Sequence, residues 1–433
     1  MFHSTSRARR TVLVAASAAV VAVGLAACSS GGSGSNSSAS EFTFLAINEN
    51  TTIPTVLTSL SENECAAENT ALPLKINKQA QASLDQQLQL LGGQNALPSA
   101  FVSPNSPDLL KELNEAGKVA DFTGTDAEKS IVPVALSGVH TLYDDKTLVL
   151  PTELNIEGIW YNKALLTQAG IAEPDSWEAL NDSFGTLAGA GIQPISAAGK
   201  GGDGWGVTRW VGAYIYRTLG PDALKKIADG SAKLTDPEYA EAADTIAGLG
   251  SAGYFGPSPS SIDYATALNQ FLTGQAAYYY MGSWAVSAFN DEAQNKIGAD
   301  NIGFLPFPAV KGGAGSADQT PANVGTDIAF SKAAYDGDEK VKAWADCIAA
   351  NYGAAALREG QITGFTVNGD VEVPPLTKLV QTEIADSGET VQWFEALFGP
   401  AATTASQTNG GPLGSGQLSG SDFMNTVQSS LGN

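Results

Sequence analysis

The chain alternates between short apolar runs and longer amphipathic stretches, which is typical of an α/β protein with largely parallel sheets. Apolar runs at 42–47, 100–103 and 147–150 predict three strands. Residues 237–249 and 338–352 carry apolar side chains at helical spacing, so each segment predicts a helix with one buried face. We expect strands and helices of this kind to build the core.

Glycine-rich stretches mark the segments that are expected to stay irregular. Residues 403–421 are rich in Gly, Ser and Thr and predict a long loop, whereas 422–431 predict a final helix. Residues 199–204 match the spacing GxGxxG of a dinucleotide-binding turn. That turn must open a helix, but Trp205 and Gly206 follow here, so we expect a plain loop and no dinucleotide cofactor.

The first 27 residues have the pattern of an export signal. Three arginines precede an apolar run at 11–24, which is too short for a bilayer core of roughly 30 Å. The following Leu25-Ala-Ala-Cys28 resembles a bacterial lipobox, whose cysteine is acylated, and an ordinary cleavage site is the alternative. Residues 28–40 are mostly Ser, Gly, Asn and Ala and predict a flexible tether. We expect removal of residues 1–27 and attachment to the outer face of the cell membrane only through lipid on Cys28.

The net charge of the chain is strongly negative, −22 over the whole sequence. Residues 1–27 hold three arginines and no acid, so the remaining 406 residues carry 20 basic against 45 acidic side chains, or −25. Such a body repels nucleic acid and anionic lipid, and we expect neither as a partner. Its length is sufficient for two lobes.

Metal and catalytic chemistry have few candidate residues. Beyond the signal the only histidine is His140, so the sequence contains neither a histidine cluster nor an HExxH pair. A Ser-His-Asp triad would have to use His140, and no GxSxG turn presents a serine. We therefore expect no metal, no cofactor and no enzymatic activity. Two carboxylates would suffice for a glycoside hydrolase, and with 45 acids that alternative stays open.

The seven tryptophans divide into two groups by their surroundings. Strand or helix patterns place three of them in the core: Trp160, Trp177 and Trp344. Four lie in or beside glycine-rich or polar loops: Trp205, Trp210, Trp284 and Trp393. Sugar rings stack their apolar C–H faces on aromatic rings, and their hydroxyl groups need planar polar partners. The second group therefore predicts a carbohydrate site.

Three motifs occur in series along the chain. They are Gly158-Ile-Trp-Tyr-Asn-Lys163 with its continuation to Leu180, Phe271-Leu-Thr-Gly-Gln-Ala-Ala277 with Met281-Gly-Ser-Trp-Ala285, and Phe304-Leu-Pro-Phe-Pro308 with Val324-Gly-Thr-Asp-Ile-Ala-Phe-Ser331. In this order they resemble the family of bacterial extracellular solute-binding proteins that includes maltose-binding protein.

The resemblance implies a periplasmic-binding-protein-like fold of two α/β lobes, joined by a hinge of three crossings, with the ligand in the cleft between the lobes. The crossings are expected near 151–156, 323–327 and 363–368. The N-terminal lobe would comprise 41–151 plus 325–365, and the C-terminal lobe 152–324 plus 366–433.

The resemblance also implies a function without bond making or breaking. The protein would bind a carbohydrate, and we expect an oligosaccharide, outside the cell. The lobes would close on the ligand, and the closed protein, a monomer, would be recognised by the membrane permease of an ATP-driven (ABC) importer. A binder of a non-sugar solute with the same fold is the first alternative, and a secreted glycoside hydrolase is the second.

The resemblance also implies positions for ligand-binding residues. Trp284, in Met-Gly-Ser-Trp, matches the sugar-stacking tryptophan of the family, and Trp393 lies where relatives often place another. Two asparagines stand where relatives often carry acids, Asn105 after the strand 100–103 and Asn155 in the first crossing. The remaining candidates come from loop position: Asn48, Glu49, Trp205, Arg209 and Asp327.

Cys65 and Cys347 remain once Cys28 is assigned to lipid. In an exported protein they could form a disulfide or stay as two free thiols. The resemblance places the helices of both cysteines in the N-terminal lobe, and this favours the disulfide.

Overall fold

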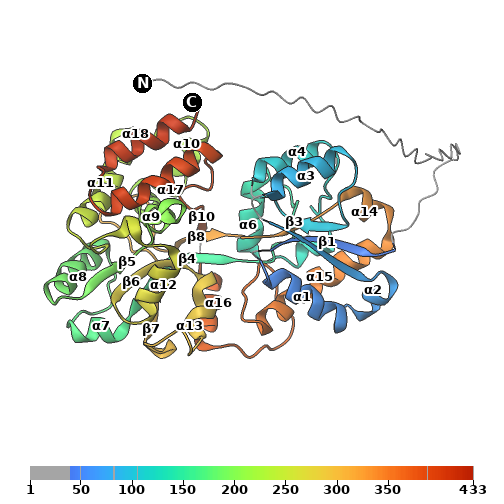
Figure 1. Cartoon of the computed structure of the whole chain (residues 1–433), viewed down its shortest axis with the longest axis horizontal. Coiled ribbons are helices and arrows are strands. Elements are labelled where there is room, and N and C mark those ends of the chain that lie inside the picture. The colour runs from blue at the N-terminus through green and yellow to red at the C-terminus, as the bar shows by residue number, and fades with distance from the viewer. Residues whose placement is uncertain (1–39, 49, 81–82, 105, 388, 433) are drawn as a thin grey trace, which may run out of the picture. The chain divides into compact units, whose positions relative to one another are not determined.

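Two β-sheets, each with its own helices, organise the chain (Figure 1). The computed structural model describes residues 40–48, 50–80, 83–104, 106–387 and 389–432. We call the part built on the four-stranded sheet the first lobe and the part built on the six-stranded sheet the second lobe. Among the described residues, no helix has both the length and the apolar character needed to cross a membrane.

The sheet of the first lobe has the order β2-β1-β3-β9. β1 pairs in parallel with β2 and β3, whereas β9 is antiparallel to β3 and comes from much later in the chain. Its strands are β1 (Phe42–Ile47), β2 (Leu74–Gln79), β3 (Ala100–Val102) and β9 (Ile328–Phe330). Its helices are α1 (Thr52–Glu62), α2 (Ala66–Ala71), α3 (Leu84–Gly93), α4 (Pro107–Glu115), α5 (Asp126–Lys129), α6 (Pro133–Leu142), α14 (Lys332–Gly337) and α15 (Glu339–Arg358).

The sheet of the second lobe has the order β10-β8-β4-β6-β5, and β7 also pairs with β4. All eight residues of β4 are buried, as expected for a strand covered on both faces. The strands are β4 (Asn155–Asn162), β5 (Gln193–Ser196), β6 (Ala276–Gly282), β7 (Ile302–Leu305), β8 (Gln319–Asn323) and β10 (Glu389–Val391).

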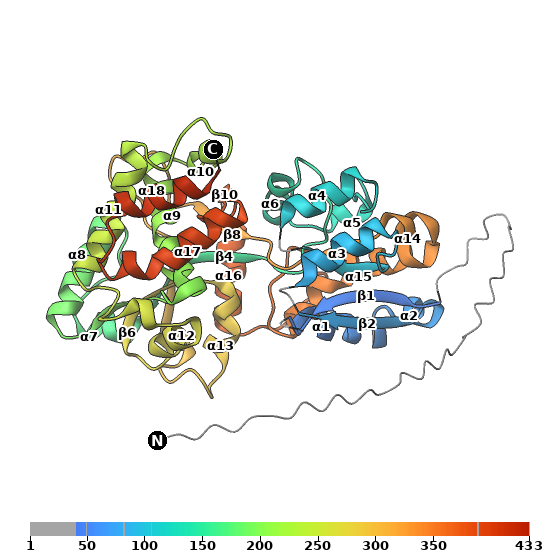
Figure 2. The same ribbon diagram turned by 45° about the horizontal axis from the view of Figure 1, so that its top comes forward.

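Ten α-helices and several single 3₁₀ turns cover this sheet among the described residues. The α-helices are α7 (Lys163–Gln168), α8 (Trp177–Gly189), α9 (Trp205–Leu219), α10 (Ala223–Ala228), α11 (Pro237–Ser251), α12 (Tyr264–Leu272), α13 (Val286–Asn290), α16 (Pro375–Asp386), α17 (Pro400–Gly414) and α18 (Gly420–Ser430). The 3₁₀ turns are η2 (Gly201–Gly204), η3 (Pro259–Ser261), η4 (Ser283–Ala285) and η5 (Ala299–Asn301). Figure 2 shows α9, α11, α17 and α18 gathered on one side of the lobe.

The chain passes between the lobes three times. It leaves the first sheet at Leu150, which forms an isolated bridge with Ile328, and enters the second sheet at Asn155. It returns between the end of β8 and the start of β9, and passes over once more between α15 and α16. Asn155 and Asn323 lie directly opposite each other in the β4–β8 pair, so two of the crossings meet at this point.

Most of the predicted elements are confirmed, and one strand is not. The strand at 42–47 and the helices at 237–249 and 338–352 are present, the helices slightly longer than expected. The run 147–150 is buried but is not a strand, because only Leu150 finds a bridging partner. Apolar character alone did not distinguish a buried connection from a paired strand.

The predicted loop at 403–421 is wrong, since most of it belongs to α17. A Cβ atom at Gly410 would lie 2.2 Å from the carbonyl oxygen of Gly204, and one at Gly411 would lie 2.1 Å from that of Gly199. The glycines therefore allow close backbone packing of a helix, and they do not mark an irregular segment.

The plain loop expected at 199–204 is also wrong, because this stretch follows β5 and leads directly into α9. The order strand, glycine-rich turn, helix is thus the one that the dinucleotide motif requires. The close approach that its glycines permit is used by α17, however, since a Cβ at Gly204 would lie 1.8 Å from the Gln407 carbonyl oxygen.

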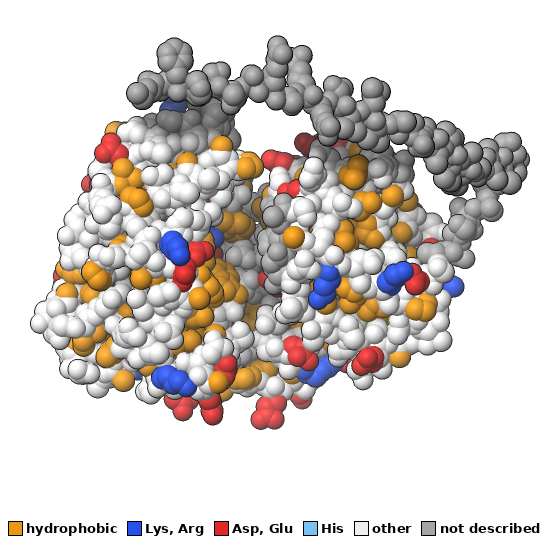
Figure 3. Space-filling model, in the orientation of Figure 1, with side chains coloured by type: hydrophobic (Ala, Val, Ile, Leu, Met, Phe, Trp, Pro, Cys, Tyr) orange, Lys and Arg blue, Asp and Glu red, His pale blue; other side chains and the backbone are white. Residues whose placement is uncertain are grey.

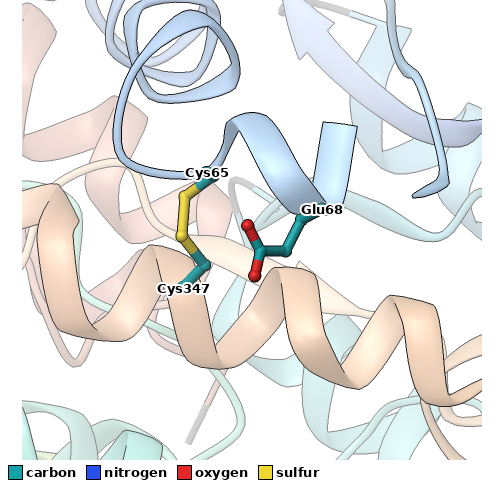
Figure 4. A group of neighbouring side chains, drawn as sticks. All are labelled: Cys65, Glu68 and Cys347. Atoms are coloured by element: carbon teal, nitrogen blue, oxygen red, sulfur yellow. A yellow bond between two sulfur atoms is a disulfide. The ribbon is translucent and has the colours of Figure 1, made fainter. Parts of the chain in front are cut away.

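A disulfide joins Cys65, at the start of α2, to Cys347 in the middle of α15 (Figure 4). Glu68 lies beside the two sulfur atoms, and together the three groups are close enough to suggest metal ligands. Both sulfurs are bonded to each other and offer no thiolate, so we assign the group to cross-linking of two helices in the first lobe.

Each lobe has its own hydrophobic core, packed around its own sheet. Trp344 lies in the first lobe, and the predicted core tryptophans Trp160 and Trp177 lie in the second. Trp210, which the sequence placed beside a loop, is fully buried in α9 against Phe184, Phe255 and Phe307. The expectation of a loop position for Trp210 is therefore wrong.

Candidate functional site

Arg209 lies close to two tryptophans of the second lobe. Trp205 and Arg209 are four residues apart on α9 and so share one helix face. The guanidinium carbon lies 5.7 Å from the Trp205 ring centroid and 5.6 Å from that of Trp393, which follows β10. Both distances allow cation–π attraction. Both rings are partly exposed, so each keeps surface available for a ligand.

Two buried carboxylates face the same guanidinium. Arg209 Nε lies 3.1 Å from Glu157 Oε2, and Nη1 lies 2.6 Å from Glu395 Oε2. The acids are each 1% exposed and Arg209 is 10% exposed. Glu395 also accepts hydrogen bonds from the hydroxyl groups of Thr208 and Ser406. This geometry fixes Arg209 against the second sheet and holds its charge largely neutralised.

A chain of polar side chains runs from this ion pair to the crossings. Asn155 and Glu157 are alternate residues of β4 and therefore point to the same side of the sheet. Asn155 Nδ2 donates to Asn323 Oδ1 at 3.5 Å, and the Asn323 amide in turn contacts Glu157. Ser283 donates to Asn155 Oδ1 at 3.3 Å. Burial raises the pKa of Glu157, and the charge of Arg209 opposes this shift.

Trp284 lies at the edge of this cluster, directly after β6. A Cβ at Gly282 would lie 1.9 Å from the indole ring, so glycine is required for the ring to lie against the backbone. The Trp284 and Trp205 rings meet edge to face, with centroids 5.9 Å apart. A side-chain hydrogen bond to Tyr264 also holds the partly exposed indole.

Two further carboxylates lie at the crossings. Glu153 accepts a hydrogen bond from Asn50 at 3.0 Å, which connects the first crossing to the loop after β1. Asp327 is 2% exposed, and its Oδ1 has no hydrogen-bond partner. Burial raises the pKa of both groups, and the charge of Glu153 raises the pKa of Asp327 further.

Figure 3 shows the surface hollowed between the two lobes, with hydrophobic side chains along the wall of the second lobe. Asn323 and Gln392 line a small hollow together with Gly138 and Leu142 of α6, so polar groups of the second lobe face the first lobe here. A larger cavity of about 410 Å³ lies between the end of α15 and α16. Its lining is mainly aliphatic and includes one aromatic side chain, the buried Phe365, so it offers less stacking surface than the tryptophan cluster.

The structure brings together five of the residues proposed from the sequence: Trp205, Arg209, Trp284, Trp393 and Asn155. Asp327 lies apart, at the edge of the first sheet, where its backbone pairs with Ser103. Asn48 is exposed, and its backbone N–H donates to the Gln79 carbonyl. Glu49, Asn105 and Cys28 lie outside the described residues.

Sequence reasoning missed Glu157, Glu395 and Asn323. Glu157 carried a weak signal, because it stands two residues after Asn155 in an otherwise apolar strand and thus shares its face. Glu395 follows Trp393 by two residues, but no spacing rule connects it to Arg209, which lies 186 residues earlier.

Comparison with known proteins gives a family match over most of the described chain. The model of the family described as bacterial extracellular solute-binding protein matches residues 66–355. An uncharacterised ABC transporter extracellular-binding protein of Pyrococcus horikoshii is 25% identical over 230 residues, which are 50% of this chain and 51% of that protein. A probable sugar-binding periplasmic protein of Mesorhizobium japonicum is 26% identical over 203 residues, 46% and 47% of the two chains.

Similarity to solved structures extends over almost the whole fold. A chitin oligosaccharide binding protein superimposes with a TM-score of 0.74 at 24% identity, covering 90% of this chain and 98% of the other. In sequence, by contrast, the chain spans about half the length of the curated relatives it matches. All three proteins are described as binding proteins.

Proposed function

The chain belongs to the family of bacterial extracellular solute-binding proteins, and from this premise we propose that it binds a carbohydrate, most simply an oligosaccharide, for an ABC importer. The cluster of Trp205, Trp284 and Trp393 around Arg209 carries the proposal. Partly exposed indoles give stacking surfaces, and the Asn155–Asn323–Glu157 chain gives acceptors and donors for hydroxyl groups. The relative from Mesorhizobium japonicum, described as sugar-binding, supports the same assignment.

The mechanism that we propose is closure of the lobes on the ligand. The lobes correspond to 41–151 plus 325–365 and to 152–324 plus 366–433, with the ligand held between them. A sugar that contacts both lobes binds the closed arrangement better, and this difference in affinity shifts the population towards closure. The protein then makes and breaks no bond and acts as a monomeric carrier for the permease.

The location that we propose is the outer face of the cell membrane. An extracellular position agrees with the family, and the lipid on Cys28 with the tether 28–40 would keep the binding lobes near the permease. Two acyl chains give lasting attachment where one is marginal. Mass spectrometry of the membrane-extracted protein should find a mature N-terminus at a diacylglyceryl-modified Cys28, and a Cys28→Ser variant should be recovered free of the membrane.

Calorimetry of the purified protein against a panel of neutral oligosaccharides tests the function. We expect saturable binding of one sugar class with a dissociation constant near the micromolar range, about −8 kcal/mol. Chromatography of the same mixtures checks for hydrolysis products. Binding of a peptide or other non-sugar solute in place of every sugar would replace the proposal by the first alternative, and turnover of a sugar would replace it by a glycosidase.

A further inference from the structure

The polar part of the candidate site contains far more negative than positive groups. Three carboxylates belong to it, from Glu153, Glu157 and Glu395, and its one cationic side chain among the described residues is Arg209. A hydrogen bond joins Asn155 to Asn323, and Asn155 lies on the same face of β4 as Glu157 and two residues after Glu153. A ligand in this site therefore lies in a field dominated by acids.

Arg209 is the one cationic group here among the described residues, and two of its three nitrogen atoms already face acids. Its Nε and Nη1 atoms face Glu157 and Glu395 at 3.1 and 2.6 Å. The guanidinium carbon also lies within 6 Å of the Trp205 and Trp393 ring centroids. A two-pronged contact uses two neighbouring nitrogens of the guanidinium, so a ligand carboxylate would have to share Nε or Nη1 with an acid that already faces it.

We propose that the site accepts uncharged sugars and rejects sugars that carry a carboxylate, and that Glu157 and Glu395 impose this selection. The inference rests on the proposed function, because it assigns the charge class of the same ligand. Neither acid needs to touch the sugar. Each acts through Arg209, by occupying the nitrogen atoms that would otherwise attract a uronic acid.

Glu157 is the better position for a test. Glu395 also accepts hydrogen bonds from Thr208 and Ser406, so its replacement disturbs α9 and α17 as well. Glu157 has an ion-pair contact with Arg209 Nε, but neither of its carboxylate oxygens has a hydrogen-bond partner among the described residues, and a glutamine has the same size. The change Glu157→Gln releases Arg209 Nε and removes one negative charge from the site.

The experiment compares a neutral oligosaccharide that binds the parent protein with the matched sugar in which one hydroxymethyl group is a carboxyl group. At pH 7.5, roughly three units above the pKa of a free carboxyl, we expect the parent protein to bind the uronic acid form at least tenfold more weakly. In Glu157→Gln this preference should shrink at least tenfold. The control is Glu359→Gln, which removes the same charge from the exposed end of α15 and should leave the preference unchanged.

Equal or tighter binding of the uronic acid by the parent would overturn the inference, and so would an unchanged preference in a folded Glu157→Gln variant. The parent comparison needs no variant, and Glu395→Gln provides a second one should Glu157→Gln fail to fold. If the protein bound neither sugar of the pair, nor any sugar of the panel, the proposed function would be overturned as well. Failure of the charge selection and failure of the proposed function are therefore distinguishable.

Discussion

Arg209 Nη1 lies 2.6 Å from Glu395 Oε2, although 186 residues separate the two positions in the chain. Arg209 belongs to the first turns of α9, and Glu395 lies between β10 and α17. Their contact fixes the segment that carries Trp393 to the helix that carries Trp205. The spacing of these two indoles around the guanidinium thus depends on one buried carboxylate.

Replacement of Glu395 by Ala should reduce the stability of the protein. Thr208 and Ser406 lose a hydrogen-bond acceptor and Arg209 loses one of its two acidic partners, and buried polar groups without partners are costly. Glu157 still faces Arg209, so we expect a loss of about 1–3 kcal/mol in the free energy of unfolding. Urea denaturation measures the loss. Glu359→Ala, at an exposed site, should stay within about 0.5 kcal/mol of the parent, and an equal effect of both changes would contradict the role given to Glu395.

Replacement of Trp284 by Ala should weaken sugar binding at least tenfold while the fold persists. The indole is partly exposed and packs at the edge of the cluster, so its removal takes away a stacking face more than core volume. Calorimetry gives the affinity, and circular dichroism checks the fold. Trp284→Phe keeps a smaller ring and should bind with intermediate affinity. Unchanged affinity in Trp284→Ala would remove this residue from the site.

The sequence predicted the strands and helices that have a local hydrophobic pattern. It failed for segments whose structure depends on packing against distant residues. The strand at 42–47 has strong apolar character and pairs on both sides, so its bounds were predictable. The segment now in α17 looks like a loop by composition, because its glycines serve contacts with Gly199 and Gly204, about 200 residues away. No pattern within the segment itself reveals such contacts.

The same limit applies to the candidate site. Trp205, Trp284 and Trp393 attract attention because large aromatic residues stand beside glycine or polar positions. Glu157 and Glu395 are two of 45 acids, and only the folded chain shows that they flank one guanidinium. Residue type in the sequence was therefore sufficient to select the tryptophans of the site. The two acids could be recognised only from their positions in the folded chain.

Two neighbouring glycines of η2 should respond differently to alanine. At Gly204 a Cβ would lie 1.8 Å from the Gln407 carbonyl oxygen of α17, whereas at Gly202 nothing lies within 4 Å. Gly204→Ala should therefore push α17 away and cost about 2–3 kcal/mol or more, as overpacking does. Gly202→Ala should be nearly neutral. Thermal denaturation compares the two variants, and equal melting temperatures would show that α17 does not pack as described.

Loss of the Cys65–Cys347 bridge should destabilise the first lobe. The bridge closes a loop of 282 residues and joins α15 to the start of α2. Constraint of so long a loop in the unfolded chain is worth about 2–5 kcal/mol. Urea denaturation of the parent with and without a reducing agent measures this contribution. The double variant Cys65→Ser, Cys347→Ser should resemble the reduced parent and should not respond to the reducing agent, and a parent that shows no response would contradict the bridge.

The stability of the Asp327→Asn variant relative to the parent should increase as the pH rises from 4 to 7. Burial and Glu153 raise the folded-state pKa of Asp327 above its unfolded value of 3.8, so between those two values the folded protein holds more protons. The parent therefore loses stability with rising pH, at up to about 1.4 kcal/mol per unit, until the folded-state pKa is passed. Asparagine does not titrate, and its amide can replace an Oδ1 atom that has no partner. Urea denaturation at several pH values gives the difference between variant and parent, with Glu359→Gln as the control for loss of charge. A difference that stays constant, or falls, with rising pH would mean that Asp327 is ionised in the folded protein without cost.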